Sequence, residues 1–127
     1  MITDDALVDA LLMEIANLLH RLIDQNEPGT IDLRAMPLSP SCIEILKQRL
    51  GQGEITVQLN AAGHSEIHET NFAGVWWTKP ADESGRVIAL LIEVATVPNI
   101  LLANIEDMQR SMDRLPGSTN FAQFAHG

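Results

Sequence analysis

The sequence has one cysteine, no tyrosine and only eight lysines and arginines in 127 residues. A single cysteine, Cys42, cannot form an internal disulfide or supply a CxxC pair or a thiolate-rich zinc site. Seventeen acidic residues give a net charge of −9, which would repel nucleic acid and anionic lipid where no basic cluster exists. The N-terminus has acids where a secretory signal needs lysine or arginine, and the longest apolar run, Val87–Ile92, is too short to span a membrane. We therefore expect a cytoplasmic protein that binds neither nucleic acid nor membrane.

Apolar periodicity predicts helices and strands in a definite order. Residues 6–25 place their leucines and isoleucines on one helical face, with Thr3 as the N-cap, and residues 41–50 predict a second, shorter helix. Strands are predicted at 30–33, 54–60, 64–70, 75–79 and 86–95, the last as an interior strand covered on both sides. A final helix is predicted from Pro98, with a possible break and new cap at Asn104.

This order predicts an α+β fold. Consecutive strands joined by short loops pair antiparallel, so we expect a meander of four to five strands. An N-terminal amphipathic helix, a short second helix and a C-terminal helix would cover the sheet. Hydrophobic residues make up 46% of the chain, enough to form one core without metal or disulfide.

Few residues are arranged for chemistry. On an extended strand His64, Glu66 and His68 point to one side, as metal ligands could, but residues i and i+4 of a strand lie about 13 Å apart. Cys42 opens the second helix, where a helix N-terminus would lower the pKa of a thiol; the alternative is a small side chain packed in the core. We therefore predict no catalytic residue, metal ligand or cofactor site.

Three of the five aromatic residues, Phe72, Trp76 and Trp77, fall within six positions. Adjacent strand residues face opposite sides, so only one tryptophan would enter the core, and the other would be covered by a helix or left on the surface. A half-exposed tryptophan beside Phe72 would suit a partner-binding anchor; the alternative is that both are buried between layers. Glu93 interrupts the apolar strand 86–95, which favours an interaction or structural role over a catalytic one.

Four stretches resemble the conserved C-terminal domain of the HupH/HyaF hydrogenase expression and formation proteins. They are Ile31-Asp-Leu-x-x-Met-Pro37, Leu50-Gly-Gln-Gly-Glu-Ile55, Glu69-Thr-Asn-Phe-Ala-Gly-Val-Trp-Trp77 and Ile92-Glu-Val-x-x-Val-Pro98. The Glu69–Trp77 stretch is the specific one, and it adds Glu69 to the predicted partner-binding residues. The resemblance implies one HupH-type domain over residues 1–117. We expect residues 118–127 to form a partly disordered tail, because they have little to pack except Phe121 and Phe124.

The resemblance also implies a non-enzymatic accessory protein in the maturation of [NiFe] uptake hydrogenases. Its expected partners are the precursor of the iron–sulfur small subunit or other maturation factors. Two alternatives remain open at this point. One is a metal- or cluster-handling protein that uses His64, Glu66 and His68, and the other is a homodimeric interaction module closed by the exposed aromatic residues.

Overall fold

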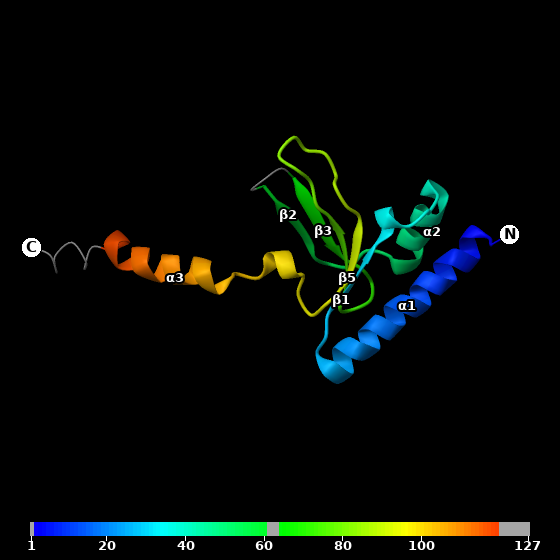
Figure 1. The fold of residues 1–127 in the computed structure, drawn as a ribbon, viewed down its shortest axis with the longest axis horizontal. Coiled ribbons are helices and arrows are strands. Elements are labelled where there is room, and N and C mark those ends of the chain that lie inside the picture. Colours follow the sequence, from blue (N-terminus) through cyan, green and yellow to red (C-terminus); the bar gives the residue numbers. More distant parts are fainter. Residues whose placement is uncertain (1, 61–63, 120–127) are drawn as a thin grey trace, which may run out of the picture.

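The computed structural model describes residues 2–60 and 64–119 and begins with a long amphipathic helix, α1 (Asp4–Gln25) (Figure 1). Thr3 caps the helix by accepting a hydrogen bond from the Ala6 N–H at 3.1 Å. The helix ends at Asn26, whose left-handed backbone (φ 57°) breaks the helical path. The predicted helix and its cap are therefore confirmed. The residues that α1 buries recur at helical spacing: Val8, Leu11, Ile15 and Leu18.

Five antiparallel strands form one sheet: β1 (Gly29–Asp32), β2 (Thr56–Leu59), β3 (Ser65–Glu69), β4 (Val75–Lys79) and β5 (Leu91–Val94). Their order is β1-β5-β4-β3-β2, so the last four form a meander and β1 pairs with β5 at one edge. The predicted α+β class and antiparallel meander are confirmed. In this order β4, which carries both tryptophans, is the middle strand.

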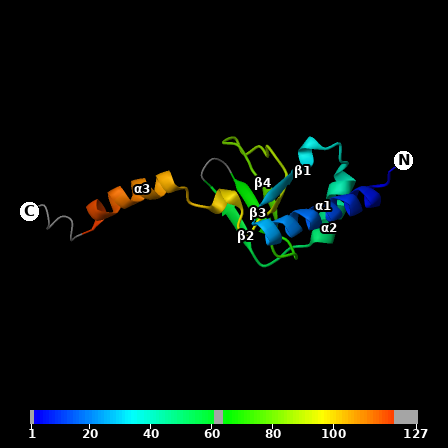
Figure 2. The ribbon, with the colours of Figure 1, turned by 60° about the horizontal axis from the view of Figure 1, so that its bottom comes forward.

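A second helix, α2 (Pro40–Leu50), packs beside α1 (Figures 1 and 2). Ser39 caps it by accepting a hydrogen bond from the Cys42 N–H at 3.0 Å, and Pro40 occupies the first helical position, where a missing N–H costs nothing. Both helices contribute to the core that covers one face of the sheet. The core includes Ile15, Leu18, Ile31, Leu33, Leu46, Leu50, Val75, Trp77, Ile92 and Val94. Among the described residues, no helix is both long enough and apolar enough to cross a bilayer.

The apolar run before β5 departs from the prediction. Strand β5 is interior, as expected, but it covers only Leu91–Val94 rather than residues 86–95. Val87 and Ile88 lie on the surface, 41% and 57% exposed. The preceding segment turns back on itself instead, with the Ile88 N–H donating to the Pro80 carbonyl. Pro80 has no N–H of its own, which explains why the β4 ladder stops there.

The C-terminal helix forms where a cap was predicted but does not cover the sheet. Helix α3 (Ile105–Arg114) begins at Asn104, whose side chain accepts from the Asp107 N–H at 2.8 Å. None of its ten described residues is buried, and the element it packs against is the 3-10 turn that follows it, Leu115–Ser118. Figure 1 shows α3 extending away from the sheet. The expectation that this helix covers the sheet is therefore wrong; residues 120–127 of the predicted tail lie outside the described part.

Candidate interaction site around the β4 tryptophans

Both tryptophans of β4 are buried. Trp77 is 5% exposed and belongs to the core beneath α1 and α2, whereas Trp76 points to the opposite face and is 6% exposed. The Trp76 indole N–H donates to the Ala95 carbonyl at 3.0 Å, in the chain that follows β5. Neither indole is thus the half-exposed anchor that the sequence suggested. The residues of β4 from Val75 to Thr78 are all buried, so this strand is buried on both faces of the sheet.

The strand register brings three of the predicted partner-binding residues into one row. Glu69 on β3 and Glu93 on β5 lie directly opposite Trp76, one on each side. Side chains at such positions are about 5 Å apart at Cβ, so both carboxylates flank the indole on the face away from α1 and α2. Both glutamates are half-buried, and Glu93 accepts a weak hydrogen bond from the Asn99 N–H at 3.4 Å.

Phe72 lies at the turn between β3 and β4 and is 50% exposed. The turn is held by the buried Thr70, whose hydroxyl donates to the Val75 carbonyl at 2.9 Å and accepts from the Phe72 N–H at 3.1 Å. Gly74 takes a positive φ of 85° within the same turn. Of the three clustered aromatic residues, Phe72 is therefore the one available to a partner.

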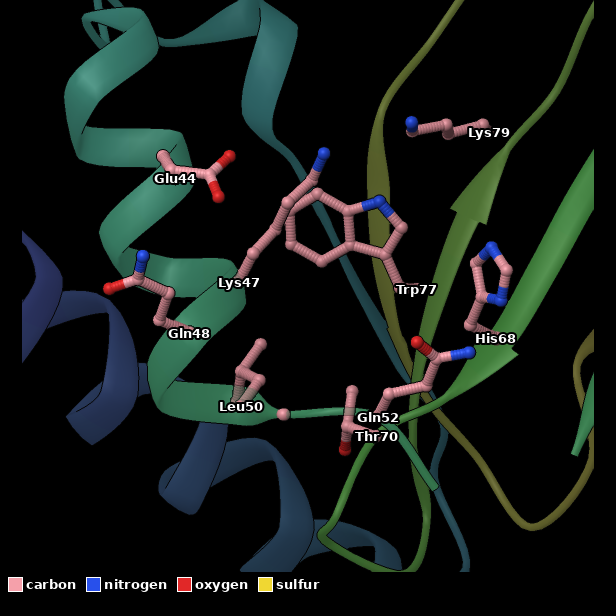
Figure 3. Close-up of a pocket in the computed structure, with 10 residues that line it drawn as sticks. Glu44, Lys47, Gln48, Leu50, Gln52, His68, Thr70, Trp77 and Lys79 are labelled. Atoms are coloured by element: carbon pink, nitrogen blue, oxygen red, sulfur yellow. The ribbon is translucent and has the colours of Figure 1, made fainter. Parts of the chain in front are cut away.

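A hollow of about 370 Å³ lies between α2 and strands β3 and β4, and the ring of Trp77 is one of its walls (Figure 3). We call it the Trp77 pocket. The ammonium group of Lys47 lies 5.4 Å from the centroid of the Trp77 ring, within the range of a cation–π contact. The indole N–H of Trp77 has no hydrogen-bond acceptor in the part of the chain that the structure describes. The lining residues are Glu44, Lys47, Gln48, Leu50, Gly51, Gln52, His68, Thr70, Trp77 and Lys79.

The pocket brings two lysines of an acidic chain together. Burial lowers the pKa of Lys47, and the nearby charge of Lys79 lowers it further. The carboxylates of Glu44 and Glu66 act in the opposite direction. Cationic donors, an acidic acceptor and an aromatic surface thus share one open hollow, a combination suited to a polar segment of another protein.

The predicted metal-ligand candidates do not come together. His68 lies 3.5 Å from the Glu66 carboxylate, but the ring of His64 is hydrogen-bonded to the Asn60 side chain at 3.0 Å. Among residues 2–60 and 64–119, no group of three His, Cys, Asp or Glu side chains could hold a metal ion.

Cys42 is fully buried in the core. Its pKa is raised, first by burial and then by the charge of Asp4. The possibility that the start of α2 activates this thiol is therefore wrong, because desolvation outweighs the helix N-terminus.

Sequence reasoning missed the lysines of the Trp77 pocket. Lys47 lies on the polar side of α2 and Lys79 at the end of β4, and nothing in their spacing links them. They meet because α2 packs over the sheet, which is a tertiary event.

Comparison with known proteins gives a consistent result. Residues 7–121 match the family model described as "HupH hydrogenase expression protein, C-terminal conserved region". A solved structure titled "Hydrogenase expression protein HupH from Thiobacillus denitrificans" is 41% identical, with a TM-score of 0.80 over 85% of this chain and 90% of that chain.

Curated relatives are more distant. The hydrogenase expression/formation protein HoxQ of Azotobacter vinelandii is 32% identical over 69% of this chain and 31% of its own length. The hydrogenase-1 operon protein HyaF of Escherichia coli is 27% identical over 87% of this chain and 39% of its own. The chain therefore spans about a third of the length of the curated relatives it matches.

Proposed function

This chain belongs to the HupH hydrogenase expression protein family, and on that premise we propose that it is a non-enzymatic accessory protein of hydrogenase maturation. The observation that carries the proposal is the family match over residues 7–121, which includes both core helices, the sheet and the Trp77 pocket. The client we propose is the precursor of the iron–sulfur small subunit of a [NiFe] uptake hydrogenase, bound in the cytoplasm before export.

The charge of the chain supports a basic client. A net charge of −9 attracts basic partners at long range and speeds their encounter. Glu69 and Glu93 add two half-buried carboxylates beside Trp76. These residues and Phe72 remain our proposed contact residues on that side of the sheet.

The Trp77 pocket would supply specificity. Its lysines, Glu44 and the indole can each pair with a different group of an inserted side chain, so binding there depends on shape and charge together. In this proposal Trp77 acts as the floor of the pocket rather than as an exposed anchor. Substituting it would disturb the core, which makes the lysines the better residues to test.

The test measures binding of the full chain to the purified small-subunit precursor by titration calorimetry. Lys47→Glu and Lys79→Glu should each weaken binding about tenfold relative to Arg21→Glu, since each removes a cationic donor from the pocket while the net charge changes by the same amount. Arg21→Glu is the matched control, because it makes the same charge change on the exposed side of α1. Phe72→Ala should weaken binding by a similar factor without unfolding.

The outcomes test the proposed client and the proposed contact site separately. Absence of binding by the unaltered chain to the precursor overturns the proposed client. Lys47→Glu and Lys79→Glu variants that bind the precursor as tightly as Arg21→Glu does would show that only the net charge acts, which overturns the pocket as the contact site.

A further inference from the structure

Helix α3 has an apolar row that its own chain does not cover. Its side chains are 68% (Ile105), 49% (Met108) and 64% (Met112) exposed, and Leu115 just after the helix is 64% exposed. Figures 1 and 2 both show the helix extending away from the sheet, so no other described element lies over the row. A helix of ten residues without tertiary packing is marginal in water. Helix α3 therefore needs a surface of another molecule that covers its apolar row.

The spacing of the row indicates what kind of surface that is. Ile105, Met108, Met112 and Leu115 follow one another at intervals of three, four and three residues, which are the a and d positions of a heptad repeat. A strict a/d row is the narrow seam by which one helix packs along another, whereas a helix that covers a sheet needs a wider apolar face. The expected partner is thus another helix.

The charges of α3 favour a second copy of the same helix. With Ile105 at position a, the flanking e and g positions are Gln109 and Ser111, both uncharged, so two identical helices meet without repulsion. The charged residues all fall on the solvent side of the helix: Glu106, Asp107, Arg110, Asp113 and Arg114.

The charge balance of the whole chain points the same way. Residues 96–119 carry a net charge of only −1. The other −8 lies in the part formed by α1, α2 and the sheet, which we call the body. Two such acidic bodies repel each other, and the nearly neutral helix at the far end is where two copies can meet at least cost. Acidic residues in the first turn and Arg114 in the last favour an antiparallel pair, in which the helix dipoles also oppose.

We propose that α3 pairs with α3 of a second copy through the seam Ile105, Met108, Met112 and Leu115, forming a two-fold homodimer with the two bodies held apart. The seam is less than two heptads long, so the interface is smaller than the roughly 1,200 Å² of a stable complex. The dimer should therefore dissociate on dilution. This inference does not rest on the proposed client, because it concerns a different face of the molecule.

Sedimentation equilibrium of the full chain over a range of concentrations tests the proposal. The unaltered chain should shift from monomer to dimer as concentration rises. Met108→Asp with Met112→Asp should raise the dimer dissociation constant at least about 100-fold, since four unpaired carboxylates, two from each copy, would enter the seam. Met108→Leu with Met112→Leu should lower it, because leucine packs well at a and d.

Arg110→Glu is the matched control. It changes the net charge of the same helix by the same amount, but on the solvent side, and should leave dimerisation within about threefold of the unaltered chain. A second readout is helicity: dilution below the dissociation constant should reduce the circular dichroism signal at 222 nm while the fluorescence of Trp76 and Trp77, both on β4, stays unchanged.

Three results would overturn the proposal. The chain could remain monomeric up to its solubility limit. It could dimerise equally well with aspartates in the seam, which would place the interface elsewhere. Or the aspartate pair could abolish binding of the small-subunit precursor while the unaltered chain shows no self-association, in which case the seam belongs to the client.

Discussion

Helices α1 and α3 are both amphipathic and both begin at a side-chain cap, yet α1 buries four residues in the core while α3, fully within the described residues, buries none. The difference lies in the width of the apolar face. In α1, partly buried residues broaden the central row on both sides, and they are Leu7, Leu12, Leu19 and Leu22. In α3 the row is one residue wide. A broad face packs on a sheet and a second helix together, and a narrow one suits a single helix.

The largest predicted effect is at the buried face of α1. Ile15→Ala should lower the free energy of unfolding by about 2–5 kcal/mol, because the side chain is 4% exposed within the core and leaves a cavity. Ile23→Ala on the same helix is the control, since Ile23 is 79% exposed and should cost less than about 0.5 kcal/mol. Urea unfolding followed by circular dichroism measures both. Equal losses from the two variants would show that α1 packs differently in solution.

The two tryptophans of β4 allow a second comparison, between the two faces of the sheet. Trp76→Phe should cost about 1 kcal/mol more than Trp77→Phe, because it leaves the Ala95 carbonyl without its indole donor. Trp77→Phe removes an N–H that has no acceptor in the described part of the chain, so no hydrogen bond is lost. Urea midpoints of the two variants, each retaining one fluorescent tryptophan, measure the difference. The opposite order would mean that the Trp77 N–H has a partner in solution.

Local rules were enough to predict most of the body. Caps at Thr3 and Asn104, the stop before Gly51 and the alternation of β2 are all short-range features, and the structure confirms them. The sequence left open whether one or both tryptophans are buried, and the structure shows that both are, because that outcome depends on what packs on each face of β4. The Trp77 pocket likewise arises only when α2 packs over the sheet.

The error over α3 has a different cause. The apolar spacing of α3 predicts a helix correctly, but spacing indicates only that one face must be covered, not which element covers it. In α3 only the a and d positions are apolar, and such a narrow face indicates that the helix does not pack on the sheet. The width of an apolar helix face therefore indicates what kind of element covers it, which the spacing of its apolar residues alone does not.

A smaller effect, confined to alkaline pH, is expected at Cys42 in the core. Burial and the charge of Asp4 raise its pKa above the ordinary value of 9.0, so the folded state holds the thiol proton more tightly than the unfolded state. The stability due to this group is complete below the unfolded pKa and is lost as pH rises through it toward the folded pKa. The difference in unfolding free energy between the unaltered chain and Cys42→Ala should thus be flat up to about pH 8 and then decline. A difference that grows with pH would contradict the raised pKa.

The smallest predicted effect is at α3. Met112→Ala should change the unfolding free energy of the body by less than about 0.5 kcal/mol, since Met112 is 64% exposed and, among the described residues, its helix buries none of its side chains. Tryptophan fluorescence is the right measurement, because both tryptophans lie on β4 and report on the body alone. Self-association through α3 does not alter this expectation, since pairing the two helices adds no contact to the sheet. A loss above about 1 kcal/mol would show that α3 folds back onto the body, and α1 and α3 would then differ in degree rather than in kind.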